Sequence, residues 1–228
     1  MYLVRTIYKS FCLIEFINYA FFFFWEKKQN PKYKKRGKMK LKIYLFRHGM
    51  TNDNEEGVFS GWRDVALSRR GIRDAKIVAL RLRDKKFTLA FQSDLLRSKQ
   101  TLKEVLKFHK HVKVITDKRI KERGYGKLQG KTHLEIVQRY GYKKYDSWHR
   151  SYETRPLSGE SLKDVEIRVL KFIKDLLEIM RDEKISVAIS AHGNSMRAFR
   201  RYFEKLSIPE MCTLYNDYES VYEYNVEV

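Results

Sequence analysis

Two histidines in this chain follow short apolar runs, at points where small or polar residues begin. Arg47-His48-Gly49 comes directly after residues 43–46, and Ala191-His192-Gly193-Asn194 comes after residues 187–190. Because ligands of open α/β sheets bind at the carboxyl ends of the strands, both histidines are predicted to lie at one site. A neutral imidazole can attack phosphorus, and the planar donor fork of an arginine matches phosphate oxygens. The pairing therefore predicts phosphoryl transfer through a phosphohistidine.

The elements that position these histidines alternate between strands and helices along the chain. Short apolar runs predict strands, and apolar residues at helical spacing predict amphipathic helices. The predicted strands cover residues 43–46, 87–91, 112–115, 185–190 and 221–226, the last as an edge strand. The predicted helices cover residues 71–84, 94–106, 132–140, 162–176 and 195–206. This alternation favours an α/β fold, a three-layer α/β/α sandwich with a mainly parallel sheet.

Composition limits the class of protein. At 228 residues, the chain fits one ordinary domain with some appended sequence. Its two cysteines, Cys12 and Cys212, are too few for a disulfide framework, so a cytoplasmic enzyme is expected. The formal net charge of +20 is spread along the chain without a nucleic-acid-binding motif, so no nucleic-acid partner is predicted. The chain has no ligand-spaced cluster of Cys or His, and no metal is predicted.

The first 38 residues differ from the rest of the chain. An apolar, aromatic stretch at residues 11–25 precedes a basic segment. The stretch is shorter than the roughly 20 residues that cross a bilayer, so firm membrane association is not predicted, although an anchor stays open as an alternative. An N-terminal extension is therefore predicted for residues 1–38 and a catalytic domain for residues 39–228. Met39 is an alternative start of translation.

An ordered set of motifs runs from about Met39 to Val226. They are R-H-G at 47–49, F-S-G-W at 59–62, Q-S-D-L-L-R-S at 92–98, E-R-G-Y-G-K-L-Q-G at 122–130, W-H-R at 148–150 and A-H-G-N at 191–194. In this order they resemble the histidine phosphatase superfamily, and more closely its cofactor-dependent phosphoglycerate mutases. Residues 122–130 discriminate best, because plain phosphatases of the superfamily usually carry G-x-W-E-G there.

The resemblance implies a role for each matching residue. His48 is the expected nucleophile and Glu122 the general acid and base, while Arg47, Arg97 and His192 would stabilise charge on the transferring phosphoryl group. The implied cofactor is 2,3-bisphosphoglycerate, which primes His48, and the implied partner is a small phosphorylated substrate. The expected substrate-binding residues are Thr51, Asn54, Ser60, Gly61, Arg123, Tyr125, Arg150, Gly193 and Asn194, with His133 and His149 as further candidates.

Several positions depart from the family pattern. Met50 stands where Glu is common, Gly124 where the mutases usually have His, His133 where a Lys is expected, and His149 where the first of two arginines is expected. Fewer fixed positive charges would therefore face the distal end of the substrate. Residues 215–221 also lack the T-G-x-P run of the mutases, which predicts a looser cover that admits water to the phosphohistidine.

Two enzyme functions stay open on this evidence. The first is a mutase that interconverts 3-phosphoglycerate and 2-phosphoglycerate, and the second is a broad phosphomonoester phosphatase that uses the same residues. A catalytically dead binding module is a third alternative, disfavoured because both histidines, both core arginines and Glu122 are present. A homo-oligomer is compatible with the sequence, which does not decide the oligomeric state.

Overall fold

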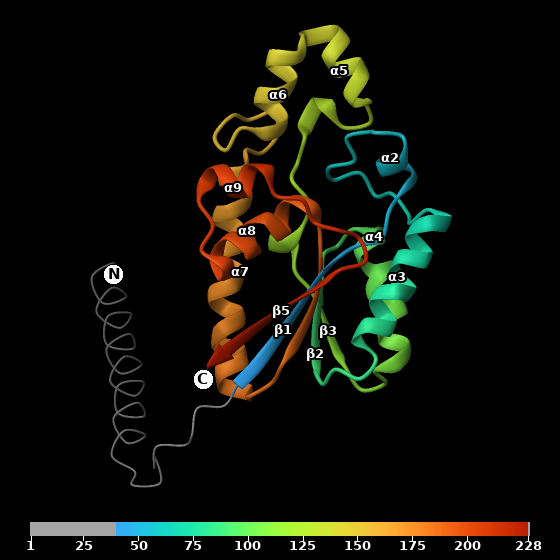
Figure 1. Ribbon diagram of the computed structural model, residues 1–228, viewed down its shortest axis with the longest axis vertical. Coiled ribbons are helices and arrows are strands. Elements are labelled where there is room, and N and C mark those ends of the chain that lie inside the picture. The colour runs from blue at the N-terminus through green and yellow to red at the C-terminus, as the bar shows by residue number, and fades with distance from the viewer. Residues whose placement is uncertain (1–39, 228) are drawn as a thin grey trace, which may run out of the picture. The chain divides into compact units, whose positions relative to one another are not determined.

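A central sheet organises the protein, whose computed structural model describes residues 40–227. The five strands lie in the order β3-β2-β4-β1-β5 (Figure 1). β1 to β4 run parallel to one another, and β5 pairs antiparallel with β1 at the edge. The expected mainly parallel sheet is confirmed. The strands are β1 Lys40–Arg47, β2 Leu89–Gln92, β3 Lys113–Thr116, β4 Val187–Ala191 and β5 Val221–Glu227.

Helices connect the strands, and every predicted helix is present with shifted ends. The helices within the described residues are α2 Asn52–Glu55, α3 Arg69–Leu82, α4 Leu96–Val105, α5 His133–Tyr140, α6 Tyr142–Arg150, α7 Leu162–Glu183, α8 Gly193–Glu204 and α9 Ile208–Thr213. Short 3-10 turns are η1 Leu106–Phe108, η2 Lys118–Ile120 and η3 Gly126–Leu128. The sequence did not predict α2, α6 or α9. α2 and α9 are only one or two turns long, and α6 contains no aliphatic residue, so none shows the aliphatic spacing from which the other helices were predicted.

The two faces of the sheet pack against different helices. Successive strand side chains point to opposite faces, so Ile43 and Leu45 join the core cluster of α7 and α8, whereas Tyr44 and Phe46 join the cluster of α3 and α4. Figure 1 shows α7 and α8 on one side of the sheet and α3 and α4 on the other. The three-layer sandwich is therefore confirmed.

The carboxyl ends of β1, β2 and β4 lie side by side at one end of the sheet. His48 follows β1, Ser93 follows β2 and His192 follows β4, so three polar side chains gather there. The loop after β1 presses against the start of α3, where a Cβ on Gly71 would lie 1.8 Å from the carbonyl oxygen of Met50. Only glycine permits this close approach, which fixes the path of the chain next to His48.

The helical pair α5 and α6 lies beyond the carboxyl ends of these strands, at the top of Figure 1. It packs on a separate small cluster that includes Phe59, Tyr125 and Trp148. No helix among residues 40–227 is long and apolar enough to cross a membrane. The predicted extension, residues 1–38, lies outside the described residues.

Candidate active site

A cleft of about 290 Å³ opens at the carboxyl ends of β1 and β4. Ligand pockets span roughly 300–1,000 Å³, so this cleft suits a small ligand. The predicted residues that line it are Arg47, His48, Asn54, Ser60, Gly61, Arg97, Glu122, Tyr125, His133, His149, Gly193 and Asn194. Thr51, Arg123, Arg150 and His192 lie outside this lining. The fold thus brings most of the predicted site together.

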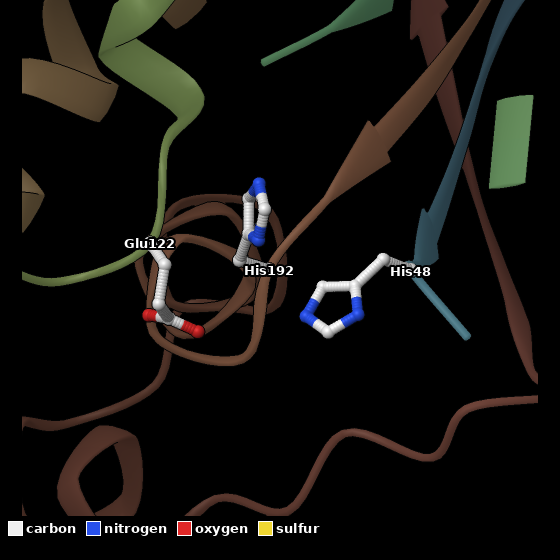
Figure 2. A group of neighbouring side chains, drawn as sticks. All are labelled: His48, Glu122 and His192. Atoms are coloured by element: carbon white, nitrogen blue, oxygen red, sulfur yellow. The ribbon is translucent and has the colours of Figure 1, made fainter. Parts of the chain in front are cut away.

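The two histidines are neighbours because their strands are neighbours. Arg47 pairs with Ala191 across the parallel β1 and β4, so the next residue of each strand is a histidine. The ring centroids of His48 and His192 are 4.9 Å apart. Figure 2 shows the two imidazoles with the carboxylate of Glu122 nearby, and ring nitrogens and a carboxylate oxygen of the three residues lie within 4.8 Å of one another.

His48 is prepared as a nucleophile by its tautomer and its charge. Its Nδ1 lies 2.7 Å from the carbonyl oxygen of Gly49, which can only accept a hydrogen bond, so Nδ1 carries the proton and Nε2 keeps its lone pair. Burial, followed by the charges of Arg97 and Arg47, holds the pKa of His48 well below 6.5. The ring is therefore neutral at physiological pH. Its Nε2 lone pair accepts a hydrogen bond of 3.3 Å from Nε of Arg97, so the nitrogen that can attack phosphorus faces one of the arginines expected to bind the phosphoryl group.

His192 is fully buried beside His48. Its Nε2 lies 2.7 Å from the hydroxyl of Ser93, whereas its Nδ1 has no protein partner. Burial, with the charge of Arg97 and the neighbouring His48, lowers the pKa of His192 well below 6.5. A buried ring nitrogen without a partner is costly in an empty site, and it fits one that binds an oxygen of a ligand.

Two arginines flank His48, and each is held in place by other groups. The guanidinium of Arg47 lies 3.8 Å from the centre of the Tyr218 ring and donates to the carbonyl of Asn216, while its buried Nε has no partner. Arg97 is fully buried and donates to the carbonyls of Arg63 and Gly61. Two fixed cations next to a neutral nucleophile match the charge of a transferring phosphoryl group.

Glu122 presents one free oxygen to this group. Its Oε1 accepts hydrogen bonds from the main-chain amide of Arg123 and from both the main-chain and side-chain amides of Asn194. No protein group among residues 40–227 donates to its Oε2, the oxygen nearer to Gly193. The carboxylate is thus fixed by one oxygen and can exchange a proton through the other.

Three predicted substrate-binding residues do not line the cleft and make contacts elsewhere. The fully buried Thr51 caps α2 and exchanges hydrogen bonds with Asn54, so it positions that amide and does not reach the cleft. Arg123 is fully buried and donates to three main-chain carbonyls. Arg150 is half-exposed and lies 3.8 Å from Asp146 on the same helix. The structure thus places these three side chains outside the cleft lining, and a role for them in substrate binding stays a prediction.

His133 and His149 line the end of the cleft that faces α5 and α6. Their rings pack together and against Phe59, and the hydroxyl of Tyr145 lies 3.1 Å from Nδ1 of His133. Burial lowers the pKa of His133, and it lowers the pKa of His149 to about 3. Both rings are neutral at physiological pH, so this end of the cleft has the reduced positive charge expected from the sequence.

The cleft also contains residues that the sequence did not single out. Tyr215, Asn216 and Tyr218 of the C-terminal segment line it, and Asn216 is buried and donates to the carbonyl of Gly193. This segment therefore forms part of the cleft wall, and the looser cover expected from its sequence stays a prediction. Arg197 of α8 lines the cleft as well. Its place after A-H-G-N was a usable signal, whereas nothing in the sequence marks Asn216 or Tyr218.

The cluster of His48, Glu122 and His192 has the ligand types of a metal site. Two observations favour an anion instead. The guanidinium charges of Arg47 and Arg97 lie beside the cluster and would repel a cation. The unpartnered Nε of Arg47 can only donate a hydrogen bond, which suits an anionic oxygen. That no metal takes part in the reaction stays a prediction.

Known proteins resemble this chain in sequence and in fold. A model of the histidine phosphatase superfamily (branch 1) matches residues 43–227. The chain is 37% identical over 171 residues to the phosphoglycerate mutase of Schizosaccharomyces pombe, covering 72% of this chain and 80% of that protein. It is 35% identical over 166 residues to the 2,3-bisphosphoglycerate-dependent phosphoglycerate mutase of Cytophaga hutchinsonii, covering 72% and 78%. Bacillus stearothermophilus YhfR has a similar structure, with a TM-score of 0.72 and 27% identity over 80% of this chain and 90% of that chain.

The α/β sandwich brings two histidines and two arginines together at its strand ends, as the motifs predicted. The chain belongs to the histidine phosphatase superfamily. The family predicted from the motifs is thereby confirmed.

Proposed function

We propose that the protein is a mutase that interconverts 3-phosphoglycerate and 2-phosphoglycerate through a phosphohistidine at His48, with 2,3-bisphosphoglycerate as the priming cofactor. The observation that carries the proposal is the mutase-like segment at residues 122–130, which discriminates best between the two activities. Its first residue, Glu122, lies beside both histidines with its Oε2 free. The names of the two sequence relatives support the same activity.

The residues of the cleft account for both halves of the reaction. In the first half, Nε2 of His48 attacks the phosphorus of a bound phosphomonoester, and the bond to the ester oxygen breaks as Glu122 gives that oxygen a proton. In the second half, Glu122 takes the proton of the accepting hydroxyl, whose oxygen attacks the phosphorus, and the bond to Nε2 breaks. Arg47, Arg97 and His192 balance charge on the phosphoryl oxygens throughout.

The cofactor would be held by the same groups as the substrate. The unpartnered Nε of Arg47 and Nδ1 of His192 fit oxygens of a phosphoryl group next to His48. Bound there, 2,3-bisphosphoglycerate supplies a phosphoryl group to an unphosphorylated His48.

An isomerisation assay on the full chain tests the proposal. We expect 2-phosphoglycerate to form from 3-phosphoglycerate, with a rate that rises when 2,3-bisphosphoglycerate is added and that is lost in His48→Ala. Release of inorganic phosphate at the same rate with and without the cofactor, with no isomer formed, would overturn the mutase proposal.

A phosphatase is the second candidate, and one observation favours it. His133 and His149 are neutral where the mutases carry cations, so the distal end of the cleft holds an anionic substrate less firmly. In that case water would accept the phosphoryl group from His48. Its signature would be release of phosphate from several unrelated esters at similar kcat/KM.

A further inference from the structure

Arg197 is a cation without an anion. It lines the cleft, burial lowers its pKa, and its one protein hydrogen bond among residues 40–227 runs from Nε to the carbonyl of Leu214. Its two terminal nitrogens donate to no protein group in that part of the chain. Arg168, which is also partly buried, is by contrast paired with Glu160. An uncompensated guanidinium beside a cleft is costly, and it marks a candidate binding group.

Arg197 reaches the cleft because of its place on α8. Gly193 and Asn194 begin that helix and line the cleft, and Arg197 follows them by four and three residues. Residues at these spacings share one helix face. The sequence A-H-G-N-S-M-R thus puts the phosphoryl-binding end of α8 and a further cation on the same side.

Arg197 lies away from the phosphoryl end of the cleft. The charges that lower the pKa of His48 are those of Arg97 and Arg47, whereas Arg197 is among the charges that lower the pKa of His149. Its own pKa responds to Tyr125 and Glu122. Arg197 is therefore on the distal side of Glu122, near the histidine pair.

The other residues expected to carry positive charge at that end of the cleft present no free cation to it. The guanidinium of Arg123 donates to main-chain carbonyls, and Arg150 lies near Asp146 outside the cleft lining. His133 and His149 are neutral. Of the described residues that line the cleft, those with a permanent positive charge are Arg47, Arg97 and Arg197.

We infer that Arg197 binds the carboxylate that the substrate carries at the end opposite to its transferring phosphoryl group. The ligand class is a small phosphomonoester with a second anionic group. The planar guanidinium fork with two free terminal nitrogens suits a carboxylate held by two parallel hydrogen bonds. The inference rests on the proposed function, because a phosphoglycerate is the ligand whose carboxylate would meet Arg197.

Calorimetric binding to the full chain tests the inference with two ligands that differ at one end. 3-Phosphoglycerate carries phosphate and carboxylate, whereas glycerol 3-phosphate carries phosphate alone. We expect the wild-type protein to bind 3-phosphoglycerate about tenfold more tightly or better, which corresponds to about 1.4 kcal/mol. In Arg197→Gln this preference should vanish, while the affinity for glycerol 3-phosphate stays within about twofold. Arg197→Lys, which keeps the charge without the fork, should retain part of the preference.

The control is Arg81→Gln, which removes the same charge from an exposed position on α3. It should leave both affinities unchanged. Equal losses for the two ligands in Arg197→Gln would overturn the inference, because they would indicate a structural role. An unchanged preference in that variant, or no preference in the wild-type protein, would overturn it as well. A preference that depends on Arg197 in a protein without isomerase activity would refute the proposed function and leave the inference standing.

Discussion

The hydroxyl of Ser93 lies 2.7 Å from Nε2 of His192, and both side chains are fully buried. The Ser93 oxygen accepts a hydrogen bond from the main-chain amide of Leu95, so its own hydrogen is available to Nε2. A neutral imidazole carries one proton, and a Ser93 hydroxyl that donates to Nε2 leaves that proton on Nδ1, the nitrogen without a protein partner. Ser93 is therefore a positioning residue that prepares His192 to donate to a phosphoryl oxygen.

Without the Ser93 hydroxyl, the imidazole proton of His192 should no longer be held on Nδ1. We expect Ser93→Ala to lower kcat by about tenfold or more, because a preorganised donor to the phosphoryl group is lost for part of the time. Nitrogen-15 NMR of His192 should show the proton moving from Nδ1 toward Nε2, and Ser93→Thr should restore both properties. An unchanged tautomer in Ser93→Ala would contradict the assignment.

Because Oε2 of Glu122 is free to exchange a proton, substitution of Glu122 should lower the rate of phosphoryl transfer by an amount that depends on the leaving group. Glu122→Gln should lower the rate of phosphoryl transfer between glycerate hydroxyls by roughly 10²–10⁴-fold, the usual contribution of a general acid and base. Dinitrophenyl phosphate releases a stable anion that needs no proton, so formation of phosphohistidine from it should change much less. Similar losses with both donors, measured by rapid quench, would remove Glu122 from the proton transfer.

The stack of Arg47 on Tyr218 predicts a role for the C-terminal segment. Tyr218→Ala should lower kcat/KM by about two- to thirtyfold, the range expected when a cation–π contact of roughly 0.5–2 kcal/mol is lost. Tyr218→Phe keeps the ring and serves as the control, with kcat/KM near the wild-type value. If the alanine variant also retained full kcat/KM, the segment would not position Arg47.

The sequence predicted the fold well where local patterns determine it. The apolar runs before His48 and His192 are β1 and β4, and their parallel pairing brings the two rings together. Helix α6 was missed because it contains no aliphatic residue, so its sequence lacks the apolar spacing that marked the other helices. Packing of α6 on Phe59 and Tyr125 is a tertiary contact that no local pattern encodes.

The site was predicted less completely, because residue type does not reveal how a donor is used. Arg123 and Arg150 match positions where the family has binding residues. The guanidinium of Arg123 donates to main-chain carbonyls, however, and Arg150 lies at the surface. Arg197 resembles an ordinary helical surface charge until α8 is placed beside the cleft. Ser93 acquires its role only through a partner 99 residues away in the sequence.

The depressed pKa of His149 predicts a pH dependence of stability. In the unfolded chain this imidazole takes up a proton near pH 6.5, whereas in the folded protein its pKa is about 3. The unfolded state therefore binds more protons as the pH falls below 6.5, and the free energy of unfolding decreases. From pH 7 to 5.5, His149 alone should account for a loss of about 1 kcal/mol.

Urea unfolding at the two pH values checks this contribution. His149→Gln should lose about 1 kcal/mol less than the wild-type protein over the same interval. His111→Gln, a substitution at an exposed histidine, is the control variant. Equal slopes for the wild-type protein and His149→Gln would mean that the folded protein accepts a proton on His149 well above pH 3.

Phosphorylation of His48 is the central claim, and mapping of the phosphoenzyme tests it most directly. The full chain is incubated with 2,3-bisphosphoglycerate, quenched in alkali to preserve phosphohistidine, digested and analysed by mass spectrometry. We predict an acid-labile phosphoryl group on the peptide that contains His48, absent from His48→Ala and present in Arg81→Gln. A phosphoryl group on any other residue, or turnover without a phosphorylated His48, would contradict the account.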